Sequence, residues 1–302
     1  MASKIAPPER IGFIGLGNMG GPMARRLAGA GYKLSVFDAS ADAVKKFAAD
    51  TESETPATLA DLAKSCRVVI TMLPNGHIVR DVLLGDDGVA SGLSDGSILI
   101  DMSSSSPVGT RETAADLAKL GFPLIDAPVS GGVKKAIDGT LAIMAGGDAA
   151  LIENCRDLLS AMGKVFVAGG SGCGHAMKSL NNFLSAINLA SAAEAVIAGE
   201  RFGLDPKVMI EILNASTGKN SATEGKYPAF ILTRTFNSGF FMGLMAKDLR
   251  LALELAESTG SPHKLLDDTK TLWERAEDKY GFKSDSVEVV RYLEELAEGH
   301  DD

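Results

Sequence analysis

The pattern of apolar and polar positions divides the chain into two halves of different character. Up to about residue 168, short runs rich in branched apolar residues alternate with amphipathic or alanine-rich stretches. Such alternation predicts a mostly parallel sheet with helices on both faces. The predicted strands are 11–16, 33–38, 68–73, 97–101, 123–127, 141–145 and 164–167. The predicted helices between them include 19–30, 107–119 and 149–162.

Beyond the glycine-rich run at 169–172, helical periodicity continues to the end of the chain. One long helical stretch covers 171–202. Further helices are predicted at 206–215, 244–258, 262–279 and 285–296. A chain of 302 residues is long enough for two domains. We therefore predict an α/β domain over residues 1–168, with a doubly wound sheet, followed by an all-helical domain over 169–302.

Composition and charge exclude several classes of function. The net charge of −9 argues against a nucleic-acid or anionic-membrane surface. Cys66, Cys155 and Cys173 are too few and too scattered for a disulfide framework or a zinc site, so we expect no metal and a reducing compartment. The first ten residues lack the apolar core of a secretory signal. No apolar run approaches the roughly 20 residues that a membrane helix requires. We expect a cytoplasmic protein.

A glycine motif follows the first predicted strand and opens the first predicted helix. Gly15 permits a tight turn, Gly17 lets the backbone approach a pyrophosphate, and Gly20 allows close packing of helix and strand. Exposed N–H groups and the helix dipole then hold the phosphates. The residues expected at this dinucleotide site are Gly15, Leu16, Gly17, Asn18, Met19 and Gly20. The alternative is a structural glycine turn with a capping aspartate, which the combined strand–turn–helix context disfavours.

Asp38 ends the second predicted strand, 18 residues beyond Gly20. A carboxylate at this position accepts hydrogen bonds from the ribose hydroxyls of adenosine and repels a 2′-phosphate. No arginine follows it. We therefore expect NAD as the cofactor, with NADP possible.

Two further loops leave predicted parallel strands, at 71–76 and 101–107. Ligands of such sheets lie across the carboxyl ends of the strands, so both loops should border the cofactor. The serines of the second loop can also cap the helix that begins at Pro107. The two roles are compatible, and both stay open.

The segment around Lys178 places polar groups on an otherwise apolar helix. Lys178, Asn181, Asn182 and Ser185 fall on one helical face. An amine in a partly dry cleft can transfer a proton, because desolvation lowers the pKa of a lysine toward neutrality. The alternative is an ordinary lysine whose stem covers apolar surface while its ammonium stays in water.

Four motifs in this order resemble the β-hydroxyacid dehydrogenase family, which includes 3-hydroxyisobutyrate dehydrogenase and tartronate semialdehyde reductase. They are Gly15–Met23, Asp126–Gly132, the segment around Lys178, and Met245–Leu249. The resemblance spans nearly the whole chain. It implies a Rossmann-like domain followed by a helical domain. It also implies NAD(P)-dependent, metal-free interconversion of a small 3-hydroxy acid and its semialdehyde or keto form.

The resemblance also assigns roles to individual residues. Lys178 matches the catalytic lysine, and Asn182 matches the asparagine that orients the substrate. The residues matching the binder of the substrate carboxylate are Ser130, Gly131 and Gly132. The residues matching positions that line the cofactor are Leu73, Pro74, Ser104 and Lys247, the last near the nicotinamide. From the residues alone, 130–132 can also be a plain glycine turn, and Lys247–Asp248 a surface ion pair.

Neighbouring families fit less well. The similar 6-phosphogluconate dehydrogenases carry a carboxylic acid seven positions after the lysine, where this chain has Ser185, so oxidative decarboxylation is not expected. Imine reductases and dinucleotide-binding scaffold proteins usually lack the lysine that this chain keeps at 178. The substrate stays open between 3-hydroxyisobutyrate, tartronate semialdehyde and related acids. The polar segment 214–221 is expected to border the substrate pocket and to favour a polar substituent.

The apolar faces of the C-terminal helices exceed what one small helical layer covers. We therefore expect a homodimer or homotetramer formed mainly by the C-terminal half. The sequence does not fix the number of subunits.

Overall fold

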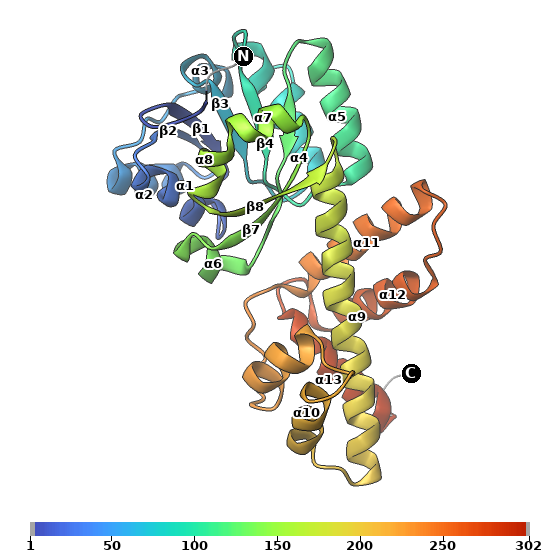
Figure 1. The fold of residues 1–302 in the computed structure, drawn as a ribbon. Coiled ribbons are helices and arrows are strands. Elements are labelled where there is room, and N and C mark those ends of the chain that lie inside the picture. The colour runs from blue at the N-terminus through green and yellow to red at the C-terminus, as the bar shows by residue number, and fades with distance from the viewer. Residues whose placement is uncertain (1–3, 300–302) are drawn as a thin grey trace. The chain divides into compact units, whose positions relative to one another are not determined.

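The computed structural model describes residues 4–299, which form two compact units. The first unit runs to Lys178 and the second begins at Ser179, so the division falls inside one helix, α9 (Cys173–Phe202). In Figure 1 this helix is the long yellow ribbon.

The first unit is built on an eight-stranded sheet. Its strand order is β2-β1-β3-β4-β5-β7-β6, with β8 paired to β7. The strands are β1 (Arg10–Ile14), β2 (Lys33–Phe37), β3 (Val68–Thr71), β4 (Ile98–Asp101), β5 (Leu124–Asp126), β6 (Val129–Ser130), β7 (Leu141–Gly146) and β8 (Gly163–Gly169). Strands β1 to β5 are parallel, whereas β7 runs antiparallel to β5 and β6. All seven predicted strands are present, and only the two-residue β6 is new.

Both faces of the sheet are covered, as a doubly wound fold requires. Val68 and Ile70 belong to one apolar cluster, and Val69 between them belongs to another. This follows from the alternation of side chains along a strand. One cluster includes side chains of α1 (Gly20–Gly29), α2 (Ala41–Thr51), α6 (Gly132–Asp138), α7 (Ala149–Asn154) and α8 (Arg156–Ser160). The other includes side chains of α3 (Leu59–Ser65), α4 (Gly76–Leu84), η1 (Val89–Gly92) and α5 (Pro107–Lys119). The single helix predicted at 149–162 is wrong, because Cys155 separates α7 from α8.

The second unit is helical and has its own core. Besides most of α9, it contains α10 (Pro206–Asn214), η2 (Ala222–Ile231), α11 (Met242–Ser258), α12 (Lys264–Tyr280), η3 (Ser286–Glu288) and α13 (Val289–Glu298). Trp273 and Tyr227 are its largest fully buried side chains. The sequence predicted every α-helix of this unit but not η2, and the predicted helix at 285–296 divides into η3 and α13.

The element η2 is a π-helix with a proline inside it. In a π-helix each N–H bonds the carbonyl five residues earlier. Pro228 has no N–H, so it leaves the carbonyl of Thr223 without its helical donor. The side-chain amide of Asn214 supplies the missing bond, at 3.0 Å from that oxygen. Asn220 stabilises the same N-terminal end of η2, since its Oδ1 accepts from the backbone N–H groups of Ala222 and Thr223.

Helix α9 is long and apolar enough to cross a membrane by length and composition alone. The expectation that no stretch would pass this test is therefore wrong. A single such helix is weak evidence for a membrane span, because core helices pass the same test. Among the residues described, Ala186, Leu189 and Ala193 of α9 are fully buried in the core of the second unit.

Candidate functional site

The glycine loop between β1 and α1 has the geometry of a phosphate-binding turn. Gly15 has φ +99°, and a Cβ there would lie 2.2 Å from the carbonyl oxygen of Met72, so only glycine fits. Around Gly17 the situation is opposite, because a Cβ would meet nothing within 4 Å. The backbone of Gly17 thus borders open space at the start of α1, whose N-cap, Met19, provides no side-chain hydrogen bond. The residues fit a dinucleotide pyrophosphate.

Asp38 is tied to this loop. Its Oδ2 accepts from the backbone N–H of Leu16 at 2.6 Å, and its Oδ1 accepts from that of Ser40 at 2.8 Å. The carboxylate is half-buried at the end of β2 and keeps free lone pairs, since a carboxylate offers about four acceptor sites. The loop and the expected ribose-binding group are therefore one hydrogen-bonded assembly.

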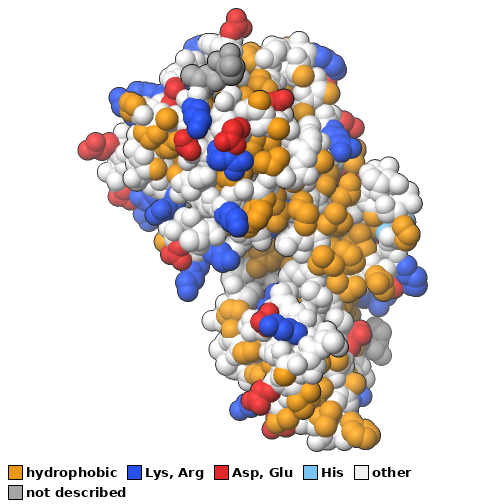
Figure 2. Space-filling view, viewed as in Figure 1, with side chains coloured by type: hydrophobic (Ala, Val, Ile, Leu, Met, Phe, Trp, Pro, Cys, Tyr) orange, Lys and Arg blue, Asp and Glu red, His pale blue; other side chains and the backbone are white. Residues whose placement is uncertain are grey.

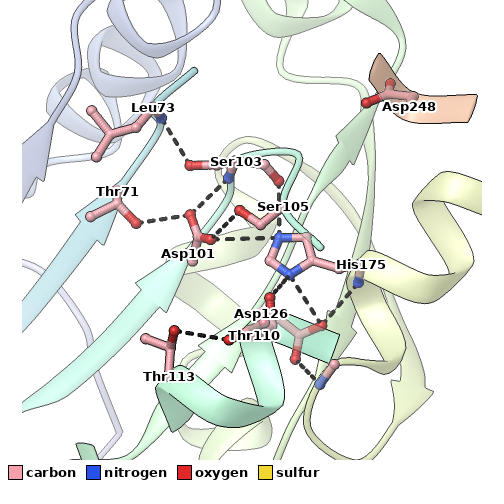
Figure 3. Close-up of polar contacts among 12 residues, drawn as sticks. Thr71, Leu73, Asp101, Ser103, Ser105, Thr110, Thr113, Asp126, His175 and Asp248 are labelled. Carbon is pink, nitrogen blue, oxygen red and sulfur yellow. Dashed lines mark hydrogen bonds and ion pairs between the residues drawn. The ribbon is translucent and has the colours of Figure 1, made fainter. Parts of the chain in front are cut away.

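The loops after β3 and β4 are joined through Asp101. Its Oδ1 accepts from Thr71 Oγ1 at 2.9 Å and from the N–H of Ser103 at 3.0 Å, while its Oδ2 accepts from Ser105 Oγ at 3.0 Å. Ser103 Oγ in turn accepts from the N–H of Leu73 at 2.8 Å (Figure 3). This network fixes the loop of Leu73 and Pro74 against the loop of Ser104.

For the serines of the loop after β4, the sequence left open whether they cap α5 or border the cofactor. Ser106 caps α5 by accepting from the N–H of Gly109 at 3.1 Å. Ser103 and Ser105 instead take part in the buried network, and Ser104 is half-buried between them. The capping role is confirmed for Ser106, and the position of this loop beside the cofactor stays a prediction.

A second part of the network fixes the start of α9. Asp126, at the end of β5, accepts from the N–H groups of Gly172 at 2.8 Å and His175 at 2.9 Å. Carboxylates are favourable at a helix N-terminus because they satisfy unpaired N–H groups. Burial raises the pKa of Asp126, which the charge and N–H of His175 partly counteract.

The ring of His175 completes this attachment (Figure 3). Its Nε2 lies 3.0 Å from the carbonyl oxygen of Ser103, which only accepts, so Nε2 carries a proton. Its Nδ1 lies 2.9 Å from Thr110 Oγ1. The side chain is fully buried with both nitrogens bonded, which is the arrangement of a structural histidine rather than of a base facing a substrate.

Sequence reasoning did not identify the Asp101–His175–Asp126 network. The three residues are far apart in the chain, and no pattern links them to one another. The available signs were that Asp101 opens the 101–107 loop and Asp126 opens the motif Asp126–Gly132, both at the carboxyl ends of predicted strands.

The polar stripe predicted on α9 is present. Lys178 and Asn182 are buried, with exposed fractions of 9% and 6%, and lie one turn apart on the helix. Asn182 Nδ2 donates to Asp248 Oδ2 of α11 at 2.5 Å, and its Oδ1 accepts from Asn181 at 3.1 Å. The amide of Asn182 is therefore held in one orientation.

Lys247 lies next to Asp248 on α11. Its Nζ is 3.4 Å from Asp248 Oδ1, and its side chain is 21% exposed while that of Asp248 is 3% exposed. The pair is thus not the surface ion pair that the sequence left open, because its carboxylate is buried and holds Asn182.

The turn at 130–132 follows β6. Gly131 and Gly132 both have positive φ, at +138° and +69°, and both are exposed, while Ser130 is half-buried. Successive backbone N–H groups in such a turn form a concavity that accepts an anion. In the described residues 4–299, no group of three or more His, Cys, Asp or Glu side chains has the arrangement of a metal site.

Known families match both halves of the chain. Residues 10–170 match the NAD-binding domain of 6-phosphogluconate dehydrogenase. Residues 172–293 match the family described as the NAD-binding domain of NADP-dependent 3-hydroxyisobutyrate dehydrogenase.

Individual proteins match over most of their length. The chain is 40% identical to 2-(hydroxymethyl)glutarate dehydrogenase of Eubacterium barkeri, covering 84% of either protein. It is 38% identical to the mitochondrial 3-hydroxyisobutyrate dehydrogenase of Bos taurus, covering 98% of this chain and 88% of that one. A solved structure of Mycobacterium tuberculosis 3-hydroxyisobutyrate dehydrogenase with L-serine superposes with a TM-score of 0.88 at 32% identity, covering 94% of this chain and 99% of that one.

Proposed function

Because the chain belongs to the β-hydroxyacid dehydrogenase family and is an NAD(P)-dependent oxidoreductase, we propose that it interconverts a small 3-hydroxy acid and its semialdehyde, with Lys178 as the proton-transfer group. The observation that carries this proposal is the buried pair of Lys178 and Asn182, one turn apart on α9. Membership of an enzyme family also sets aside the binding-only scaffold.

Lys178 moves the proton of the substrate hydroxyl. A nicotinamide bound at this site would supply the acceptor or donor of the hydride on the carbinol carbon. In oxidation, neutral Lys178 accepts the hydroxyl proton as the carbonyl forms. In reduction, its ammonium donates a proton to the new hydroxyl oxygen. Burial of this side chain supports the role, because desolvation favours the neutral amine.

Asn182 orients the reacting oxygen. Its Nδ2 has two hydrogens, and one of them is committed to Asp248 at 2.5 Å. The second hydrogen is left to donate to a substrate oxygen. Since Asp248 and Asn181 hold the amide from both sides, this donor needs no reorganisation when the substrate arrives.

The substrate carboxylate is proposed to bind at Ser130, Gly131 and Gly132. The positive φ of both glycines supports this assignment, as do their exposed backbones and the hydroxyl of Ser130. Lys247 is proposed to lie at the nicotinamide end of the cofactor.

The proposed cofactor preference is for NAD over NADP. Asp38 keeps its negative charge near the glycine loop through its bond to Leu16. Such a carboxylate accepts from ribose hydroxyls and repels a 2′-phosphate. Leu73, Pro74 and Ser104 are proposed to line the same cofactor.

The substrate is proposed to be similar to 3-hydroxyisobutyrate, with tartronate semialdehyde as the alternative. The similar proteins act on 3-hydroxyisobutyrate and 2-(hydroxymethyl)glutarate by name, and both compounds share a hydroxymethyl group beside a carboxylate. We also propose a reducing location such as the cytoplasm, because Cys66, Cys155 and Cys173 are free thiols.

An absorbance assay at the nicotinamide band tests this function. The panel contains 3-hydroxyisobutyrate, L-serine and 2-(hydroxymethyl)glutarate, each with NAD and NADP, and tartronate semialdehyde with the reduced cofactors NADH and NADPH. We expect turnover of at least one 3-hydroxy acid, faster with NAD. Absence of turnover across the panel, with NADH binding confirmed by fluorescence, would contradict the proposed substrate class.

A further inference from the structure

The side chain of Lys226 reaches the same helix that carries Lys178 and Asn182. Lys226 lies in η2, and its Nζ donates to Ser185 Oγ at 3.1 Å, with the Ser185 carbonyl oxygen at 3.5 Å. Ser185 follows Lys178 by seven residues on α9, so the two share a helical face with Asn182 between them. The ammonium of Lys226 thus lies at the far end of the proposed catalytic stripe.

The protein does not provide acceptors for all three hydrogen-bond donors of this ammonium. A lysine ammonium has three donors, whereas Lys226 finds only the two oxygens of Ser185, one of them at the limit of hydrogen bonding. Within residues 4–299, no carboxylate lies within 4.0 Å of its Nζ. Burial lowers the pKa of Lys226 to about 8, partly offset by the charge of Asp285.

Asp285 affects Lys226 through its charge but lies too far away for a direct ion pair, and its oxygens accept hydrogen bonds from other groups. They accept from Ser238 Oγ at 2.6 Å, from the N–H of Gly239 at 2.7 Å and from that of Val287 at 3.1 Å. A partly buried cation without a paired anion is unfavourable for folding, so its presence points to a ligand that supplies the negative charge.

From this arrangement we propose that Lys226 binds a second anionic group of the substrate, which makes the preferred substrates 3-hydroxy acids with a second carboxylate or similar anion. The inference rests on the proposed function, because it takes the reacting end of the substrate to lie at Lys178. Seven residues of α-helix correspond to about 10 Å along the axis. A chain of four or five carbons with a hydrogen bond of about 3 Å at either end spans that distance.

A pair of shape-matched substrates tests the proposal on the complete enzyme. 2-(Hydroxymethyl)glutarate and 2-(hydroxymethyl)pentanoate share the reacting group and differ at one end, where the first has a carboxylate and the second a methyl group. We expect wild-type enzyme to prefer the glutarate in kcat/KM. Lys226→Met should lower this preference about 10- to 100-fold, mainly through KM, since a hydrogen bond to a charged group is lost.

Two further variants separate recognition from structure. Lys226→Arg keeps the charge and should restore most of the preference. Lys283→Met removes another lysine of the second unit, which is exposed after α12 and has no proposed role, and should change nothing. Equal losses for both substrates in Lys226→Met, or an unchanged preference, would overturn the proposal.

A binding experiment keeps this proposal distinct from the proposed reaction. If neither substrate is turned over, the reaction assigned above fails. Calorimetry of NADH-loaded enzyme with non-reactive glutarate and pentanoate then decides the role of Lys226. Tighter binding of glutarate that disappears in Lys226→Met supports the second anion site, and equal binding of the two compounds overturns it.

Discussion

At the scale of single residues, the side chains proposed for chemistry are held by neighbours that do not react. Asn182 owes its orientation to Asp248, and the start of the helix that carries Lys178 is fixed by Asp126. A small displacement of such groups costs much of a rate enhancement, because orientation must be established before reaction. The aspartates therefore matter as much for catalytic geometry as for folding.

Replacement of Lys178 should remove proton transfer while leaving the cofactor site intact. We expect Lys178→Ala to lower kcat by about 10²–10⁴-fold, the range for general acid–base groups. The Kd of NADH, measured by fluorescence, should stay within about threefold. Met177→Ala is a suitable control, since Met177 is 43% exposed on the same turn. Full turnover by Lys178→Ala would disprove the assignment.

Replacement of Asp38 should alter cofactor choice. Asp38→Ala removes both the acceptor for ribose hydroxyls and the repulsion of a 2′-phosphate, so the ratio of kcat/KM for NAD to that for NADP should fall about tenfold. Loss of the bond to Leu16 affects both cofactors alike, and for this reason the ratio is the quantity to measure. A ratio that rises would reverse the proposed preference.

At the scale of elements, η2 differs from an ordinary α-helix in two ways, because it is π-helical and contains a proline. Pro228 interrupts its hydrogen bonding, and the side chain of Asn214 repairs the gap. The same element holds Lys226 near Ser185. π-Helical segments often occur at functional sites, and here the irregular element carries the cation that we assign to substrate recognition.

The depressed pKa of Lys226 predicts a stability that depends on pH. Its pKa is about 8 in the folded protein against a normal value of 10.5. Between these values the unfolded chain binds more protons, so the free energy of unfolding should rise with pH in this window. Lys226→Met should therefore be more stable than wild type near neutral pH, with a difference that narrows above about pH 8.

Urea unfolding of wild type, Lys226→Met and Lys283→Met across this range measures the effect. Lys283→Met, which removes an exposed lysine, should follow wild type at each pH. A Lys226→Met variant that is less stable than wild type near neutral pH would show that the ammonium stabilises the fold, contrary to our expectation.

The elements that could be predicted from the sequence are those in which buried apolar residues recur at the short spacing of a strand or a helix. Val68, Val69 and Ile70 form a continuous apolar run because a parallel strand is covered on both faces. The element η2 was not predicted because it contains Gly225 and Pro228, and both residue types normally argue against a helix. The contact of Asp126 with His175 spans 49 residues, and such a pairing arises only from the fold.

At the scale of the whole molecule, exposed apolar side chains of the second unit bear on the expected self-association. Phe202 is 89% exposed at the end of α9, followed by Leu204 at 52%, and Ile212 on α10 is 60% exposed. Figure 2 shows hydrophobic side chains at the bottom of the view, where Figure 1 places the end of α9. Proteins that function as monomers rarely expose large contiguous apolar patches.

We expect the protein to self-associate through this surface in the second unit. Sedimentation should give the mass of a dimer or tetramer for wild type, and Phe202→Glu with Ile212→Glu should yield monomer. Leu120→Glu serves as the control, because Leu120 is 55% exposed in the first unit. A monomeric mass for wild type at micromolar concentration would contradict the expected assembly.

The division of the molecule inside α9 bears on how such enzymes can be recombined. A crossover in the Gly169–Gly172 loop leaves the helix whole. Lys178 and Lys226 then travel together with the C-terminal half, and the nucleotide loop stays with the N-terminal half. Chimeras made at this junction should take the preference for a second anion from the C-terminal parent and cofactor choice from the N-terminal parent. The N-terminal parent must also supply the turn at 130–132 and an aspartate at the position of Asp126.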